Sequence, residues 1–184
     1  MNPIAIAPAR ARFDRMTIAG HWLGVALVLV MLGSAWAEST AASAEQAGAI
    51  LEVHRSTGTL LWGVTLARLA WRTRSARPPW PADMAPWQRR AALAAEAMLY
   101  GLLVLQPLTG FAQSIWRGKP FPLFGVDVPA LVPRDRSLVH LFEDVHAATA
   151  WLLVGLVAAH AAAALHHHFI RRDGVLRSMW PGRE

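Results

Sequence analysis

The chain has 184 residues, of which 54% are hydrophobic and 16% are charged. An average soluble domain carries roughly 25% charged residues, so this composition argues against a soluble globular protein and favours a membrane protein. Eighteen Lys and Arg against twelve Asp and Glu give a net charge of +6, but the basic residues punctuate apolar runs instead of forming the basic stripe of a nucleic-acid-binding protein. Because the chain has no cysteine, a metal site in it needs histidine or carboxylate ligands.

Four apolar stretches have about the 20 residues that a helix needs to cross the hydrocarbon core of a membrane. They cover roughly residues 16–37, 50–71, 91–113 and 142–165. We expect an all-α fold, a four-helix transmembrane bundle that makes one domain of residues 1–184, with ordered proline-rich loops before the third and fourth stretches. The first stretch follows arginines as a signal peptide would, but it exceeds the roughly 7 to 15 residues of a signal-peptide core, which favours a retained span.

The distribution of Lys and Arg predicts the orientation, because the cytoplasmic flanks of membrane helices carry the excess of positive charge. With the N-terminus inside, thirteen arginines fall on the inner side and five basic residues on the outer side, so both termini are expected to be cytoplasmic. The inner group is Arg10, Arg12, Arg15, Arg68, Arg72, Arg74, Arg77, Arg89, Arg90, Arg171, Arg172, Arg177 and Arg183, and the outer group is Arg55, Arg117, Lys119, Arg134 and Arg136. Arg55 and Arg68 lie near the ends of the second stretch, where a long side chain can reach the membrane surface.

Four of the eight histidines lie inside the predicted spans, where an ionisable side chain is costly and is a candidate for function. The first span carries His21, the second carries His54, and the fourth carries His146 and His160. The 14-residue spacing in the fourth span is close to four helical turns, so its two histidines share one face about 21 Å apart. Since alternate spans run in opposite directions, His21 matches His160 near the inner surface, and His54 matches His146 near the outer surface.

Two pairs of histidines without cysteine or nearby carboxylates describe two b-type haem sites better than zinc sites, because zinc takes about four ligands. Two axial imidazoles close both axial positions, which suits electron transfer and not direct substrate binding. Arg55 lies beside an outer ligand and is a candidate partner for a haem propionate. Short side chains that would let a macrocycle approach are Gly24, Thr57, Gly58, Gly155 and Ala164. The alternative is that these histidines and small residues serve only helix packing.

Several segments carry a family pattern: HW at 21–22, HRSTG at 54–58, RLAWR at 68–72, LYGLLVLQPLTG at 99–110, GKPFPLFG at 118–125 and HAAAALHHHFIRRDGVLRSMWP at 160–181. In this order, from about residue 12 to 181, the chain resembles the bacterial cytochrome b561 family of di-haem membrane proteins. The resemblance implies two b haems, with His21, His54, His146 and His160 as axial ligands, in the inner membrane of a bacterium. It also implies electron exchange with quinone, and at least one member oxidises superoxide at the periplasmic face.

One position departs from the family pattern. Members often carry histidines four and seven residues before the tyrosine of the LY pair, where this chain has Glu96 and Leu93. Glu96 is about level with the inner histidine pair, so it is interpreted either as a proton relay near a quinone or as a helix-end acid near Arg89 and Arg90.

The expected function is therefore one-electron transfer, with quinone as one partner and superoxide or a periplasmic protein donor as the other. Arg117 and Lys119 in the outer loop are candidates for steering an anion, although the outer side is net negative. The alternative is a haem-bearing membrane anchor subunit of a larger oxidoreductase. Of the remaining histidines, His140 is expected in the outer loop and residues 166–168 at the inner membrane surface, none of them as a ligand.

Overall fold

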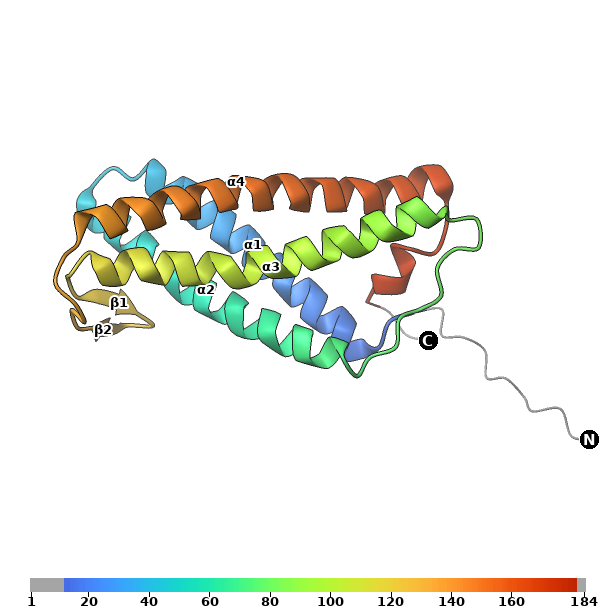
Figure 1. Ribbon diagram of the computed structural model, residues 1–184, viewed down its shortest axis with the longest axis horizontal. Helices are drawn as coiled ribbons and strands as arrows, with labels where there is room; N and C mark the ends of the chain where they lie inside the picture. The colour runs from blue at the N-terminus through green and yellow to red at the C-terminus, as the bar shows by residue number, and fades with distance from the viewer. Residues whose placement is uncertain (1–11, 182–184) are drawn as a thin grey trace, which may run out of the picture.

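The computed structural model describes residues 12–181, which form an all-α bundle with one small hairpin (Figure 1). The elements are α1 (Arg15–Ser39), α2 (Ala44–Arg72), α3 (Pro86–Trp116), β1 (Phe121–Leu123), β2 (Val126–Val128) and α4 (Arg136–His166). A π-helical turn, His167–Arg171, continues α4, and a short 3-10 turn, Arg177–Met179, follows. The predicted four-helix fold is confirmed, whereas Arg10 and Arg183, which entered the charge count, lie outside the described residues.

The helices are longer than the apolar stretches because their capping residues lie outside those stretches. Asp14 before α1, Ser43 before α2 and Asp135 before α4 each accept a backbone N–H of the first turn, as N-cap residues do. Pro86 occupies the first turn of α3, where its missing N–H costs nothing. The helices therefore extend beyond the predicted apolar stretches, by six residues where α2 and α4 begin and by five where α3 begins.

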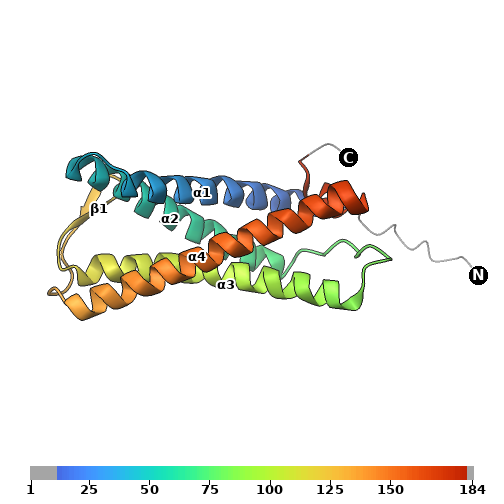
Figure 2. The same cartoon turned by 90° about the horizontal axis from the view of Figure 1, so that it is seen from above.

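The bundle consists of two antiparallel helical hairpins. α1 packs along α2 and α3 packs along α4, and α2 also contacts α3 (Figure 2). The start of α1 and the segment after α4 meet at one end, where Phe13 N donates to Ser178 O at 3.0 Å and Trp22 Nε1 donates to Met179 O at 2.7 Å. The space between the two hairpins is where the histidines of α1 and α2 meet those of α4.

Many large apolar side chains are exposed on the outside of the bundle, and few are fully buried. Leu29 is 64% exposed and Trp151 is 77% exposed, which is the distribution of a protein that faces lipid instead of water. Within residues 12–181, three helices are long and apolar enough to cross a membrane: Arg15–Ser39, Pro86–Trp116 and Arg136–Arg171. α2 is as long as the others, but the charges of Glu52, Arg55 and Arg68 make it less apolar.

The loop between α3 and α4 carries a hairpin that the sequence analysis did not predict. β1 and β2 pair antiparallel in register Phe121↔Val128, and the hairpin docks on α2 because Phe124 N donates to Ser56 Oγ at 2.9 Å. Gly118 leaves α3 with a φ of 62°, and a Cβ there would lie 2.5 Å from Arg134 N. Only glycine fits both the positive φ and this close approach, so the loop folds back over the end of the bundle where α3 ends and α4 begins.

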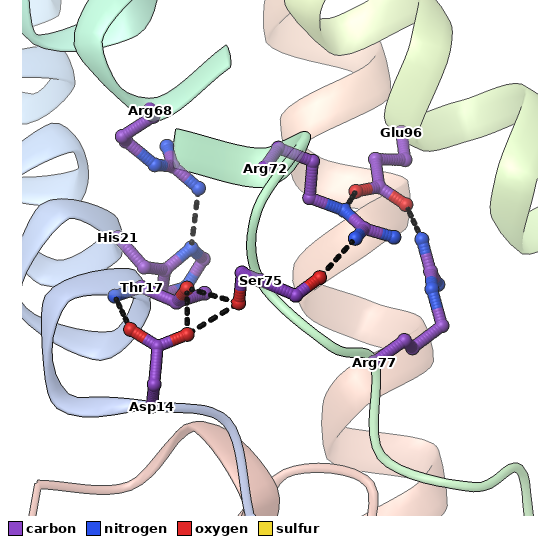
Figure 3. A network of polar contacts seen from close by, with 8 residues as sticks. All are labelled: Asp14, Thr17, His21, Arg68, Arg72, Ser75, Arg77 and Glu96. Carbon is purple, nitrogen blue, oxygen red and sulfur yellow. Dashed lines mark hydrogen bonds and ion pairs between the residues drawn. The ribbon is translucent and has the colours of Figure 1, made fainter. Parts of the chain in front are cut away.

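A polar cluster around Asp14 joins the start of α1 to the end of α2 (Figure 3). The Asp14 carboxylate accepts hydrogen bonds from Ser75 Oγ, from the backbone and side chain of Thr17 (3.0 and 2.7 Å), and from Trp71 Nε1 (2.9 Å). Burial raises the pKa of Asp14, but the bonds from Ser75, Thr17 and Trp71 outweigh burial and hold this pKa well below its ordinary value. The ionised form is therefore favoured by folding.

The lowered pKa predicts how stability depends on pH. A depressed folded-state pKa stabilises the fold fully above the unfolded value of about 3.9, and the stabilisation is lost as pH falls through the folded pKa. We expect Asp14→Asn to lower the melting temperature at pH 7 and this difference from wild type to shrink below about pH 4. Thermal unfolding in detergent across pH measures it, with Asp127→Asn in the exposed hairpin as the control. A melting temperature at pH 7 equal to that of the wild type would contradict the prediction.

Candidate haem-binding site

The four histidines of the predicted spans face one another in two pairs across the space between the helical hairpins. The ring centroids of His21 on α1 and His160 on α4 are 6.3 Å apart, and those of His54 on α2 and His146 on α4 are 6.4 Å apart. His160 is exposed and the other three rings are partly buried. The structure thus brings together the two pairs that helix direction and depth predicted, while their role as ligands stays a prediction.

The separation of the rings suits two ligands on opposite sides of one metal ion. An imidazole nitrogen binds a metal at about 2 Å and lies roughly 1.1 Å from the ring centre, so two such rings have centres about 6 Å apart. Aromatic pairs in contact also lie about 4.5 to 7 Å apart. The centroid separation therefore does not distinguish two metal ligands from two packed rings. The hydrogen bonds of the other ring nitrogen, Nδ1, are the more specific sign of a metal site.

Both histidines of the outer pair have their Nδ1 atom held by a hydroxyl group. His54 Nδ1 lies 2.9 Å from Ser34 Oγ, and His146 Nδ1 lies 2.9 Å from Thr109 Oγ1. Each hydroxyl already donates to a carbonyl of its own helix, at 3.0 Å for Ser34 and 2.9 Å for Thr109, so each accepts the Nδ1–H of the histidine. This fixes the tautomer that presents the Nε2 lone pair, as protein partners of metal-binding histidines do.

A cavity between the hairpins contains both histidines of the outer pair and is lined by all four helices. Two glycines shape its walls. A Cβ on Gly110 would lie 3.2 Å from His146 Cε1, and one on Gly58 would lie 3.3 Å from Met31 Cε. Gly58 was predicted as a small residue near the site, and Gly110 was not. Glycine at these two positions leaves room for a flat group beside the histidines.

Arg55 lines the same cavity, beside His54 as predicted. Its Nε donates to Ser114 Oγ at 3.2 Å, and its guanidinium carbon lies 5.2 Å from the centre of the Phe121 ring. A guanidinium group has five N–H donors in a fixed plane, so Arg55 offers further donors to a carboxylate in the cavity. The residues present therefore fit a b haem: two facing imidazoles, small residues beside them and a cation for a propionate.

The two predicted steering residues differ in their surroundings. Arg117 lines the cavity, and its Nη2 donates to Glu143 Oε1 at 2.7 Å. Lys119 is exposed where the hairpin loop begins. The charge of Arg117 is therefore partly balanced by Glu143, and anion steering by these two residues stays a prediction.

Glu96 is held by two arginines at the end of the bundle that is predicted to be inner (Figure 3). Arg72 Nε lies 3.3 Å from Glu96 Oε1, and Arg77 Nη2 donates to Glu96 Oε2. The arginines that pair with Glu96 are thus Arg72 and Arg77, whereas one of the two interpretations of the sequence placed it near Arg89 and Arg90. The proton-relay role of Glu96 stays a prediction.

The other histidines lie outside the two pairs. His140 is on α4 and not in the loop as predicted, with Nδ1 3.4 Å from Glu143 Oε2 and the side chain 74% exposed. His167 Nδ1 lies 2.5 Å from Asp173 Oδ2 in the turn that ends α4. Among residues 12–181, no three His, Asp or Glu side chains are grouped as the ligands of a metal ion.

Sequence reasoning missed Ser34, Thr109, Gly110 and Gln106 around the outer pair. Gln106 O lies 3.1 Å from His146 Nδ1, and Gln106 Nε2 donates to His146 O at 3.3 Å. The LQPLTG segment could have indicated Gln106, Thr109 and Gly110, because it carried the family resemblance and has a proline inside a predicted span. A proline there removes a helical hydrogen bond, and polar residues on both sides of it indicate a contact with a neighbouring helix.

Comparisons with known proteins decide the family. Residues 12–182 match the family described as prokaryotic cytochrome b561. The chain belongs to this family. It is 28% identical over 176 residues to cytochrome b561 homolog 1 of Escherichia coli strain K12, covering 94% of this chain and 99% of the relative. It is 32% identical over 170 residues to cytochrome b561 homolog 2 of the same strain, covering 91% and 90%.

A third relative, the probable superoxide oxidase CybB of Yersinia pestis, is 25% identical over 170 residues, covering 92% of this chain and 96% of the relative. The family assignment confirms the resemblance drawn from the motifs. As a cytochrome b561 protein, the chain is a membrane protein of electron transport, and the family implies a b-type haem.

Proposed function

We propose that this cytochrome b561 protein carries two b haems, one held by His21 and His160 and the other by His54 and His146. The observation that carries the proposal is the outer pair, in which Ser34 and Thr109 each accept the Nδ1–H of one histidine at 2.9 Å. Both Nε2 atoms are then free for a metal between the rings, whose centroids are 6.4 Å apart. The inner pair supports a second site, since its centroid separation is 6.3 Å.

When bound, a b haem with two histidine ligands carries one electron at a time and has no open position for a substrate. The chain's own residues bind, orient and enclose the haem. Ser34 and Thr109 keep the outer imidazoles in the ligating tautomer, Gly58 and Gly110 leave room beside them, and Arg55 offers donors to a carboxylate. The apolar outer faces of the helices keep water away from both histidine pairs.

The proposed arrangement is a multi-pass protein of the bacterial inner membrane with both termini in the cytoplasm. It is supported by the arginines at the end of the bundle where α1 begins and α4 ends. Arg72 and Arg77 bind Glu96 there, and Arg171 donates to Asp83. An excess of basic residues on one side is the mark of the cytoplasmic face.

We propose quinone as the electron acceptor and superoxide or a periplasmic protein as the donor. Superoxide is suggested by the name of the Yersinia pestis relative. In a balanced reaction, two superoxide anions give up two electrons and leave as two O2, and one quinone takes the two electrons and two protons to become quinol. Lys119 and Arg117 would attract the anion on the outer side, and Glu96 would pass a proton on the inner side.

The test is quinone reduction by the purified protein in liposomes supplied with superoxide. We expect superoxide-dependent reduction that slows in high salt, because salt screens the steering of an anion. When Arg117 and Lys119 are both replaced by Glu, we expect a slower rate that high salt no longer lowers, and an unchanged, salt-independent rate would contradict steering. No quinone reduction from any superoxide supply would contradict superoxide as donor. Reduction that needs a co-purifying larger subunit would instead indicate the membrane anchor role.

A further inference from the structure

The half-buried side chain of Arg68 lies against the inner histidine pair, beside two glycines of α1. A Cβ on Gly20 would lie 2.9 Å from Arg68 Cγ, and a Cβ on Gly24 would lie 3.2 Å from Arg68 Nη1. The two glycines are four residues apart and so lie on one face of α1, where they make a groove for the arginine stem. At its end the guanidinium carbon is 5.5 Å from the centre of the Tyr100 ring on α3, and Nη2 is 3.5 Å from His21 Nδ1.

On α2, Arg68 lies beside the inner histidine pair in the same way that His54 lies in the outer pair. The two residues are 14 positions apart on α2, the same spacing as His146 and His160 on α4, which is about 21 Å of helix and close to four turns. Where α2 presents a histidine toward the outer site, it therefore presents an arginine toward the inner site.

Arg68 differs from several arginines at the helix ends because it has no acidic partner among the described residues. Among the described residues, ion pairs join acids to Arg72, Arg77, Arg117 and Arg171, and none of these pairs includes Arg68. A cation inside a membrane bundle is costly unless an anion or polar acceptor balances it. The groove thus holds a positive charge beside a proposed haem ligand.

The chemistry of His21 specifies what would balance this charge. If His21 binds iron through Nε2, its Nδ1 carries a hydrogen and donates, as does every nitrogen of a guanidinium group. Two donors facing each other need a shared acceptor, and a carboxylate accepts from both. We propose that Arg68 is a positioning residue that binds a propionate carboxylate of the haem held by His21 and His160. This inference rests on the proposed function.

The experiment isolates the inner haem in a His54→Ala background, or in His146→Ala if the first does not accumulate. In that background we compare Arg68→Gln, Arg68→Lys and the exposed control Arg74→Gln. Gly24→Ala is a further test variant, because its added Cβ would displace the Arg68 guanidinium. Gly33→Ala on the same helix is its control, because nothing lies within 4 Å of the added Cβ. Haem dissociation rate, the resonance Raman propionate bending band and the melting temperature are recorded for each.

We expect Arg68→Gln to release haem about tenfold faster, as loss of a charge-assisted hydrogen bond would, and to move the propionate band to lower frequency. Arg68→Lys keeps the charge and should be intermediate, Gly24→Ala should resemble it, and Arg74→Gln and Gly33→Ala should match the background. A lower melting temperature with an unshifted propionate band and unchanged haem release would overturn this inference alone. Wild-type protein without haem would overturn the proposed function and this inference with it.

Discussion

Replacing His21 or His160 with alanine is expected to remove one haem, and the same one, because in the proposed arrangement each iron depends on two axial ligands from different helices. His54→Ala and His146→Ala remove the other. The ratio of haem to protein falls from about two to about one in each single variant. The double variant of one pair behaves like either single variant, because the two ligands act on one site and their effects are not additive.

The measurement is the haem-to-protein ratio of each purified variant, together with redox titration to identify which haem remains. His140→Ala is the control, because its side chain is 74% exposed and lies outside both pairs. A variant that combines His21→Ala with His54→Ala should retain no haem. If His21→Ala and His160→Ala left haems of different potential, the pairing would be wrong.

Replacing Gly110 with alanine should disturb the outer site without removing a ligand. The new Cβ would lie 3.5 Å from His146 Nδ1 and 3.2 Å from His146 Cε1, and the second distance is shorter than Cβ contacts normally are. The imidazole must then shift by a few tenths of an ångström, which we expect to weaken its 2.9 Å hydrogen bond to Thr109. Loss of a hydrogen bond to a ligating histidine typically lowers metal affinity about 10-fold to 100-fold, and we expect the outer haem to be retained about tenfold less well.

Gly101→Ala is the matched control, since it makes the same change on α3 at a position with nothing within 4 Å of the added Cβ. Haem retention during dilution, followed by absorption, separates the two variants. The inner haem serves as an internal reference because His21 and His160 lie at the other end of the bundle. Equal loss of both haems in Gly110→Ala would indicate general destabilisation and contradict the local account.

The pairing of the histidines could be predicted because it depends only on span order and depth. Successive spans alternate in direction, which places His21 level with His160 without knowledge of any contact. The hydroxyl partners could not be predicted this way. Whether Ser34 and Thr109 face a histidine depends on how each helix is rotated about its axis, and the small difference between apolar and polar faces in these helices leaves that rotation undetermined by the sequence.

Other features depended on signals outside the apolar pattern. Three helices begin at the capping side chains of Asp14, Ser43 and Asp135, which lie outside the apolar segments. The strands of the outer hairpin are three residues long, too short for an alternating pattern to be recognised. The position of Arg68 follows from the groove at Gly20 and Gly24, so a residue predicted to reach toward the surface lies instead against His21 and Tyr100.

The central claim is that one chain holds two b haems between facing histidine pairs. The most direct measurement is the haem content of the purified wild-type protein, combined with the electron paramagnetic resonance spectrum of its oxidised form. The account predicts about two b haems per chain, both low-spin with two histidine ligands. A chain that contains one haem or none, or a haem iron with an open axial position, would contradict it.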